Sequence, residues 1–142
     1  MNFHVRTTIP LATALVLGFA PFAQARTLTL SGSFVAEGGA TTTPAGQFTG
    51  TVDTMSNKIT YKITYSGLSG PVTASHFHGP ATADQTAGVL LPIPGPYTSG
   101  MQGSLTANSA TVKDILNGET YVNLHTAKYP MGEARAQVKA SP

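Results

Sequence analysis

Three histidines of this chain have the residue type and spacing of ligands for a transition metal ion. His76 and His78 stand two residues apart in a segment, 72–78, that is typical of a β-strand. Because side chains alternate along a strand, both imidazoles are expected on one face and Phe77 on the other. The two Cα atoms would lie about 6.6 Å apart, at roughly 3.3 Å per residue, so both rings could reach one ion. His125, on a later predicted strand, would complete a set of three imidazole ligands for copper or zinc. One coordination position of the ion would stay open for water or another ligand.

Further residues near these histidines are candidates to support the site. Asn123 shares a strand face with His125, and Asn123 and Glu133 are predicted to orient the imidazole rings. Met131 or Met101 could add a soft thioether for copper. The chain has no cysteine, so thiolate ligands are excluded. Its N-terminus has the pattern of an export signal, and the oxidising compartments that receive exported proteins favour Cu(II) or Zn(II).

The same histidines also fit a purely structural role. His76, His78 and His125 could hydrogen-bond loop backbone and neighbouring hydroxyls beside Gly79-Pro80. Glu133 and Arg135 also share a strand face, and this spacing favours an ion pair or a polar anchor over catalysis. Both interpretations of the histidines stay open at this level.

Few features of the sequence indicate an enzyme, and no catalytic residue or organic cofactor site is predicted. A serine hydrolase needs a nucleophile beside a histidine and an orienting acid, yet the chain has no glycine-flanked nucleophile elbow. Its aspartates, Asp53, Asp84 and Asp114, lie in segments that nothing in the sequence connects to a histidine and a nucleophile. Basic residues form no stripe, so nucleic-acid binding has no electrostatic support.

Three ordered segments carry a resemblance to a known family: Ser75–Ala81, Tyr121–Thr126 and Pro130–Gln137. Together they resemble the CHRD domain, first named in chordin. The departures are Phe77, where the family usually has isoleucine or leucine, and Ala136, where it often has glycine. Neither departure changes a histidine.

The resemblance implies a β-sandwich of immunoglobulin-like or copper-zinc superoxide-dismutase-like form, found alone in secreted bacterial proteins and as repeats in chordin. It implies no established reaction. The dismutase binds its copper through four histidines and braces a loop with a cysteine pair, whereas this domain has three histidines and no cysteine. Three functions therefore stay open: a non-enzymatic metal-binding module, a protein- or glycan-binding extracellular module with structural histidines, and a copper-dependent redox enzyme.

The elements expected to position these residues are short strands separated by turns. Alternating segments and turn signals about every ten residues predict an all-β fold, an antiparallel two-sheet sandwich of seven to eight strands. One short helix is predicted over Ala110–Asn117, capped by Asn108 or Ser109. The segment Glu37–Gly46 has turn chemistry and predicts an exposed loop.

The N-terminal segment has the pattern of a secretory signal peptide. Arg6 precedes an apolar run, Ile9–Phe22, that ends in Ala23-Gln24-Ala25, which predicts cleavage after Ala25. The run is shorter than the roughly 20 residues of a membrane-spanning helix. We therefore expect a signal peptide at 1–25, one domain at 26–142, and a periplasmic or extracellular location. The sequence identifies no partner and leaves the oligomeric state open.

Overall fold

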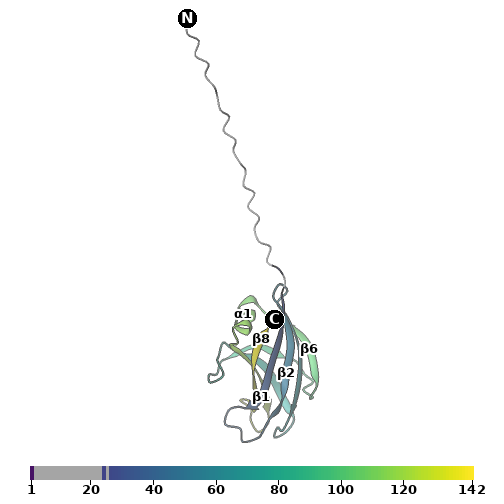
Figure 1. Cartoon of the computed structure of the whole chain (residues 1–142). Coiled ribbons are helices and arrows are strands. Elements are labelled where there is room, and N and C mark those ends of the chain that lie inside the picture. Colours follow the sequence, from purple (N-terminus) through teal and green to yellow (C-terminus); the bar gives the residue numbers. More distant parts are fainter. Residues whose placement is uncertain (2–23, 25) are drawn as a thin grey trace.

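The computed structural model describes Met1, Gln24 and residues 26–142 (Figure 1). The predicted cleavage site and the apolar run before it lie outside the described residues. Within the described residues, the chain forms eight strands and one helix: β1 (Thr27–Ala36), β2 (Ala45–Asp53), β3 (Lys58–Ser66), β4 (Val72–His78), β5 (Val89–Ile93), β6 (Met101–Thr106), α1 (Ser109–Leu116), β7 (Thr120–Thr126) and β8 (Ala134–Ser141). This number of strands and the single helix agree with the prediction.

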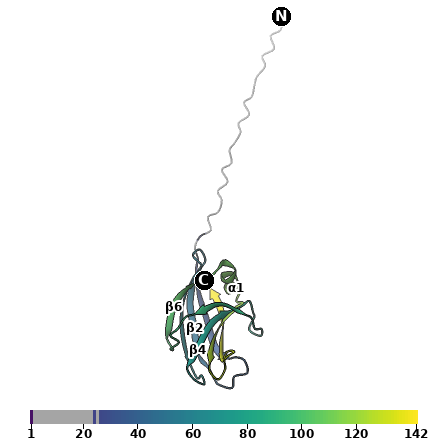
Figure 2. The same cartoon turned by 180° about the vertical axis from the view of Figure 1, so that it is seen from behind.

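The predicted two-sheet sandwich, whether immunoglobulin-like or superoxide-dismutase-like, is wrong. All eight strands form one antiparallel sheet in the order β5-β4-β7-β8-β1-β2-β3-β6. Strand β8 joins the two halves, because Ala134 is paired with Leu124 of β7 on one side and with Ala36 of β1 on the other. The sheet therefore wraps around a single interior as a nearly closed barrel (Figures 1 and 2). Alternation along each strand shows which side chains face inward, but it does not show which strands are hydrogen-bonded neighbours.

The core is built from inward-facing side chains of both halves of the barrel. Phe48 of β2 and Phe77 of β4 are fully buried and meet edge to face, with ring centroids 5.4 Å apart. Each such side chain contributes on the order of 1.5–3 kcal/mol through burial. Since Phe77 anchors β4 in this core, the histidines on either side of it must point out of the barrel wall.

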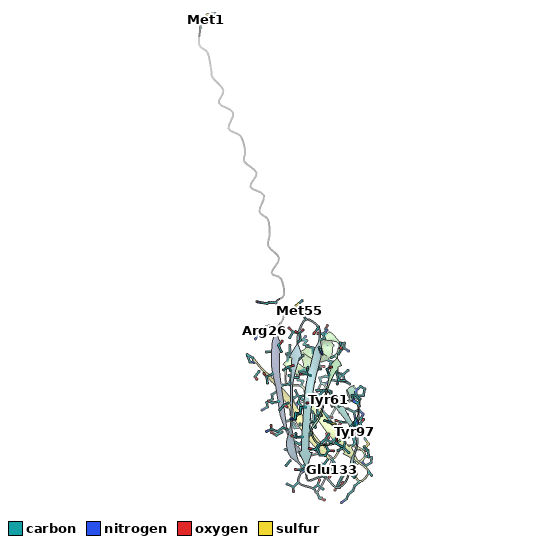
Figure 3. The ribbon with its side chains drawn as sticks, turned by 90° about the vertical axis from the view of Figure 1, so that its right-hand side faces the viewer. Met1, Arg26, Met55, Tyr61, Tyr97 and Glu133 are labelled. Atoms are coloured by element: carbon teal, nitrogen blue, oxygen red, sulfur yellow. The ribbon has the colours of Figure 1, made fainter. Side chains whose placement is uncertain are left out.

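Helix α1 lies at the end of the barrel where the C-terminus is found (Figures 1 and 2). Asn108, one of the two predicted caps, is its N-cap, and Oδ1 of Asn108 accepts a hydrogen bond of 2.8 Å from Thr111 N. Val112 and Ile115 of α1 are buried in the core. Figure 3 shows that Arg26 and Met55 lie at one end of the barrel and Glu133 toward the other.

Candidate metal centre

The three predicted ligands come together on the neighbouring strands β4 and β7. His76 is paired with Asn123 across the two strands, and a bulge between Val72 and Ala74 sets the pairing of Ala74 with His125. His125 is therefore a diagonal neighbour of His76. The prediction from strand alternation holds, since Phe77 enters the core while both flanking histidines lie beside His125.

The imidazole nitrogens converge closely enough for one ion. Each histidine offers a nitrogen, and these nitrogens all lie within 4.8 Å of one another. Nδ1 of His76 and Nε2 of His125 are 3.1 Å apart. Metal–nitrogen bonds of about 2.0–2.1 Å would place tetrahedral ligand nitrogens about 3.3 Å apart. The His76–His125 pair already has this spacing, and the nitrogen offered by His78 lies no more than 4.8 Å from those of the other two histidines.

Backbone carbonyls set the tautomers of two of these rings. Nδ1 of His78 lies 2.9 Å from the carbonyl oxygen of Ala87, and Nδ1 of His125 lies 2.9 Å from that of Pro130. A carbonyl only accepts, so each Nδ1 carries a proton and each neutral ring keeps its lone pair on Nε2. Nε2 of His78 is buried and has no hydrogen-bond partner among the described residues. An Nδ1–H bonded to a carbonyl with Nε2 left free is a common arrangement for metal-ligating histidine.

His76 is the most exposed of the three histidines. Burial lowers its pKa below the usual 6.5, the nearby His125 and His78 lower it further, and a hydrogen bond with Asn123 opposes the shift. A lower pKa keeps this ring neutral, which is the form that binds a metal. The partial exposure of His76 also leaves the site open to solvent on that side.

The side chains of Tyr121 and Arg135 stack in order behind the His78 ring. The Tyr121 ring lies parallel to the His78 ring, with centroids 4.9 Å apart, and the Arg135 guanidinium lies 3.6 Å from the Tyr121 centroid. Arg135 donates to the carbonyls of Gln85 and Thr82 at 2.6 and 2.8 Å. The loop that bonds His78 is thereby tied to β8, so the His78 ring is held by the barrel wall as well as by its own strand.

Of the other residues predicted to support the site, Asn123 lies against the histidines, whereas the two methionines lie in other surroundings. Oδ1 of Asn123 lies 2.9 Å from Nε2 of His125, in direct contact with the imidazoles. The thioether of Met131 belongs to a side chain that is 85 % exposed, and Met101 begins β6 and packs against the hydrophobic core.

Glu133 is an anchor for polar loops, and none of its hydrogen-bond partners among the described residues is an imidazole. Its carboxylate is fully buried and accepts from Thr42 Oγ1, Thr126 Oγ1, and both the backbone and hydroxyl groups of Ser69. Burial would raise the pKa of Glu133, but the hydrogen bonds from Ser69, Thr126 and Thr42 lower it from 4.5 to about 2. Of the three roles considered for Glu133, which are to orient an imidazole, to pair with Arg135 and to act as a polar anchor, these contacts fit the polar anchor.

Glu37 lies beside the site although it was not among the predicted site residues, because its segment has the turn chemistry of an exposed loop. Glu37 directly follows β1, and its backbone N–H donates to the carbonyl of Glu133. Burial raises the pKa of Glu37 above 4.5, while the charge of Arg135 and a hydrogen bond from Asn123 oppose this shift. No spacing signal links Glu37 to the histidines, because the pairing of β1 with β8 brings it there.

Comparison with protein families gives a match to the CHRD domain, which covers residues 26–138. Neither the curated proteins nor the solved structures include a match to this chain. The family match covers nearly all of the described barrel and contains the three histidines. This chain therefore belongs to the CHRD-domain family.

Proposed function

We propose that this protein is an exported, non-enzymatic binding module that holds one copper or zinc ion on His76, His78 and His125. The observation that carries the proposal is the convergence of three imidazole nitrogens within 4.8 Å. In addition, Nε2 of His78 is buried and has no hydrogen-bond partner in the described part of the chain. A buried polar atom without a partner is costly, and a metal ion would satisfy this lone pair. Three protein ligands would leave one position for water or a donor from another molecule.

The half-exposed position of His76 favours storage, delivery or sensing of the ion. An ion that a partner can reach through an open coordination position can be exchanged by ligand substitution. The donor set contains no thiolate, so oxidation of cysteine would not release the ion.

Calorimetric titration of the metal-free mature chain with Cu(II) and Zn(II) tests this proposal. We expect one ion per chain, and we expect His76→Ala, His78→Ala and His125→Ala together to abolish the tight binding. His76→Ala alone is the safer variant for folding, because His76 is the least buried of the three. Equal affinities for the wild type and a folded triple variant would refute the proposal.

A second candidate function is an extracellular protein- or glycan-binding module with structural histidines. A groove of about 350 Å³ favours it, lined by Tyr61, Met101 and part of the segment 94–100. The hydrogen bonds of His78 and His125 to carbonyls also suit a structural role. In this case, Tyr61→Ala should weaken capture of an envelope glycan or protein that the wild type retains, while histidine variants that fold should retain it.

A copper-dependent redox enzyme is the third alternative, and it requires the metal site first. Superoxide and peroxide turnover by copper-loaded protein, measured against free copper, would separate it from the non-enzymatic module. We expect no turnover above that of the triple-alanine variant.

The proposed export is supported by the charged and apolar pattern of the N-terminus. No helix in the part of the chain that the structure describes is long and apolar enough to cross a membrane. Mass spectrometry of the protein recovered from the periplasm or medium should find Arg26 as the first residue.

A further inference from the structure

The Asn123 carboxamide lies between the histidine cluster and the carboxylate of Glu37. Asn123 is only 2 % exposed, and its Oδ1 lies 2.9 Å from Nε2 of His125. Its Nδ2 lies beside the Glu37 carboxylate, close enough to oppose the rise that burial causes in the pKa of Glu37. The two side chains meet over Gly132, where a Cβ atom would lie 2.6 Å from Glu37 Oε2 and 3.3 Å from Asn123 Nδ2.

The chemistry of the neighbours decides which end of this amide faces the imidazoles. Pro130 accepts the Nδ1 proton of His125, so a neutral His125 ring presents a lone pair at Nε2. An ionised carboxylate also only accepts, so Glu37 attracts the amide Nδ2–H₂ toward itself. Oδ1 of Asn123 is therefore directed at Nε2 of His125, and two acceptors face each other. A cation placed beside both would stabilise this arrangement.

The Glu37 carboxylate is incompletely satisfied within the described part of the chain. Its Oε2 is buried and has no hydrogen-bond partner there. The positive charge of Arg135 acts on Glu37, but its guanidinium is already bonded to Gln85, Thr82 and Gln137. The local field around Asn123 is therefore suited to a positive ion.

We propose that Glu37 is a positioning residue that holds Oδ1 of Asn123 toward the three imidazoles, so that the site offers three nitrogens and one oxygen to a divalent cation. This inference depends on the proposed metal-binding function. An oxygen donor and a nearby carboxylate favour Cu(II) or Zn(II) over Cu(I), which prefers soft ligands. Without Glu37, the amide can reverse and donate Nδ2–H to His125 Nε2, where it would compete with the ion.

Glu37→Gln in the mature chain tests the role of the carboxylate. Glutamine can donate to Oδ1 of Asn123 and so permits the reversed amide. We expect Cu(II) and Zn(II) affinities, measured by chelator competition, to fall about 10–100-fold, a typical effect for residues that orient metal ligands. Cu(I) affinity, measured without oxygen, should fall less than Cu(II) affinity, because Cu(I) does not depend on the oxygen ligand and is affected only through His125 Nε2. Asp114→Asn on α1 is the matched control, because it also removes one carboxylate, and it should leave all affinities within about twofold.

A double-mutant cycle with Asn123→Ala separates positioning from charge alone. If Glu37 acts through the amide, Glu37→Gln should cost less than about threefold when Asn123 is already alanine. An equal loss in both backgrounds would overturn the inference. Should Asn123→Ala fail to fold, the ¹⁵N chemical shift of His125 Nε2 replaces the cycle. Glu37→Gln should shift this resonance through a new hydrogen bond from Nδ2, and an unchanged resonance would overturn the inference.

The two proposals fail in different ways. A wild-type protein that binds no Cu(II) or Zn(II) would overturn the metal site itself and this inference with it. Wild-type binding with an unchanged Glu37→Gln affinity would overturn only the role of Glu37.

Discussion

Nδ1 of His76 and Nε2 of His125 are 3.1 Å apart, although the two residues are 49 positions apart in the sequence. With Nδ1 of His125 bonded to Pro130, the gap between the two rings can be filled by a proton or by a metal ion. Protons and metal ions therefore compete for the same lone pairs.

Metal affinity should decrease as the pH falls. Each imidazole must lose its proton to bind a metal. The pKa of His76 is lowered from 6.5, mainly by burial, so His76 stays neutral to a lower pH than a free imidazole does. We expect affinity to change little above about pH 7 and to fall steeply by about pH 5, within the range where histidine titrates. Chelator competition across this range checks the prediction, and a flat profile would exclude imidazole ligands.

Glu133 should make the fold sensitive to acid. Its pKa in the folded protein is about 2, against 4.5 when unperturbed, so the folded state binds the proton less readily than the unfolded state. The stabilisation is therefore complete above pH 4.5 and is lost as the pH falls toward 2. Glu133→Gln should remove this part of the pH dependence and lower the free energy of unfolding at pH 7 by about 3 kcal/mol.

Urea unfolding at several pH values measures both effects of the Glu133 change. Asp114→Asn serves as the control for loss of a carboxylate. A Glu133→Gln protein as stable as the wild type at pH 7 would show that the negative charge of Glu133 contributes no net stabilisation.

Gly132→Ala should damage both the fold and the metal site. Gly132 has φ 125°, which disfavours any Cβ, and the added atom would press on Glu37 and Asn123. Gly100→Ala is a matched control, because Gly100 has φ 94° but no atom within 4 Å of the added Cβ. Both variants should lose about 1–3 kcal/mol of stability from backbone strain. Only Gly132→Ala should also lose metal affinity, by about tenfold or more, and equal affinities in calorimetry would contradict the predicted contact.

Arg135→Ala should release the loop that holds His78. The change removes hydrogen bonds to Gln85, Thr82 and Gln137 and the contact with the Tyr121 ring. We expect a loss of about 3 kcal/mol in unfolding free energy. Hydrogen exchange should become faster at Ala87, whose N–H donates to Tyr121, and at Gly79, whose N–H donates to the carbonyl of Gly88. Arg135→Lys should recover little, because an ammonium group cannot reproduce the planar fork of donors. Unchanged exchange in this loop would show that Arg135 does not restrain it.

The local elements follow closely from the sequence. The cap at Asn108, the helix behind it, and the alternation that buries Phe77 between two outward histidines all depend on contacts within a few residues. Such contacts are encoded by spacing alone, and for this reason the three histidines stand out in the sequence as candidate ligands. The family can be recognised on the same basis, since its motifs are short local segments.

The pairing of strands that are distant in the sequence cannot be predicted from local spacing. β8 has a pattern of side chains that suits either a sandwich or a barrel, and only its pairing with both β1 and β7 shows that the sheet is continuous. The partners of Glu133 were also hidden, because Thr42 and Ser69 lie 91 and 64 positions away.

The sequence by itself determined which faces of β4 and β7 carry the imidazoles, because alternation is a property of every extended chain. Only the tertiary structure decided that the rings meet, that the carbonyls of Ala87 and Pro130 bind Nδ1–H of His78 and His125, and that Glu37 stands behind Asn123. These relationships depend on strand register and loop closure, which are set by the packing of the whole barrel and not by any local run of residues.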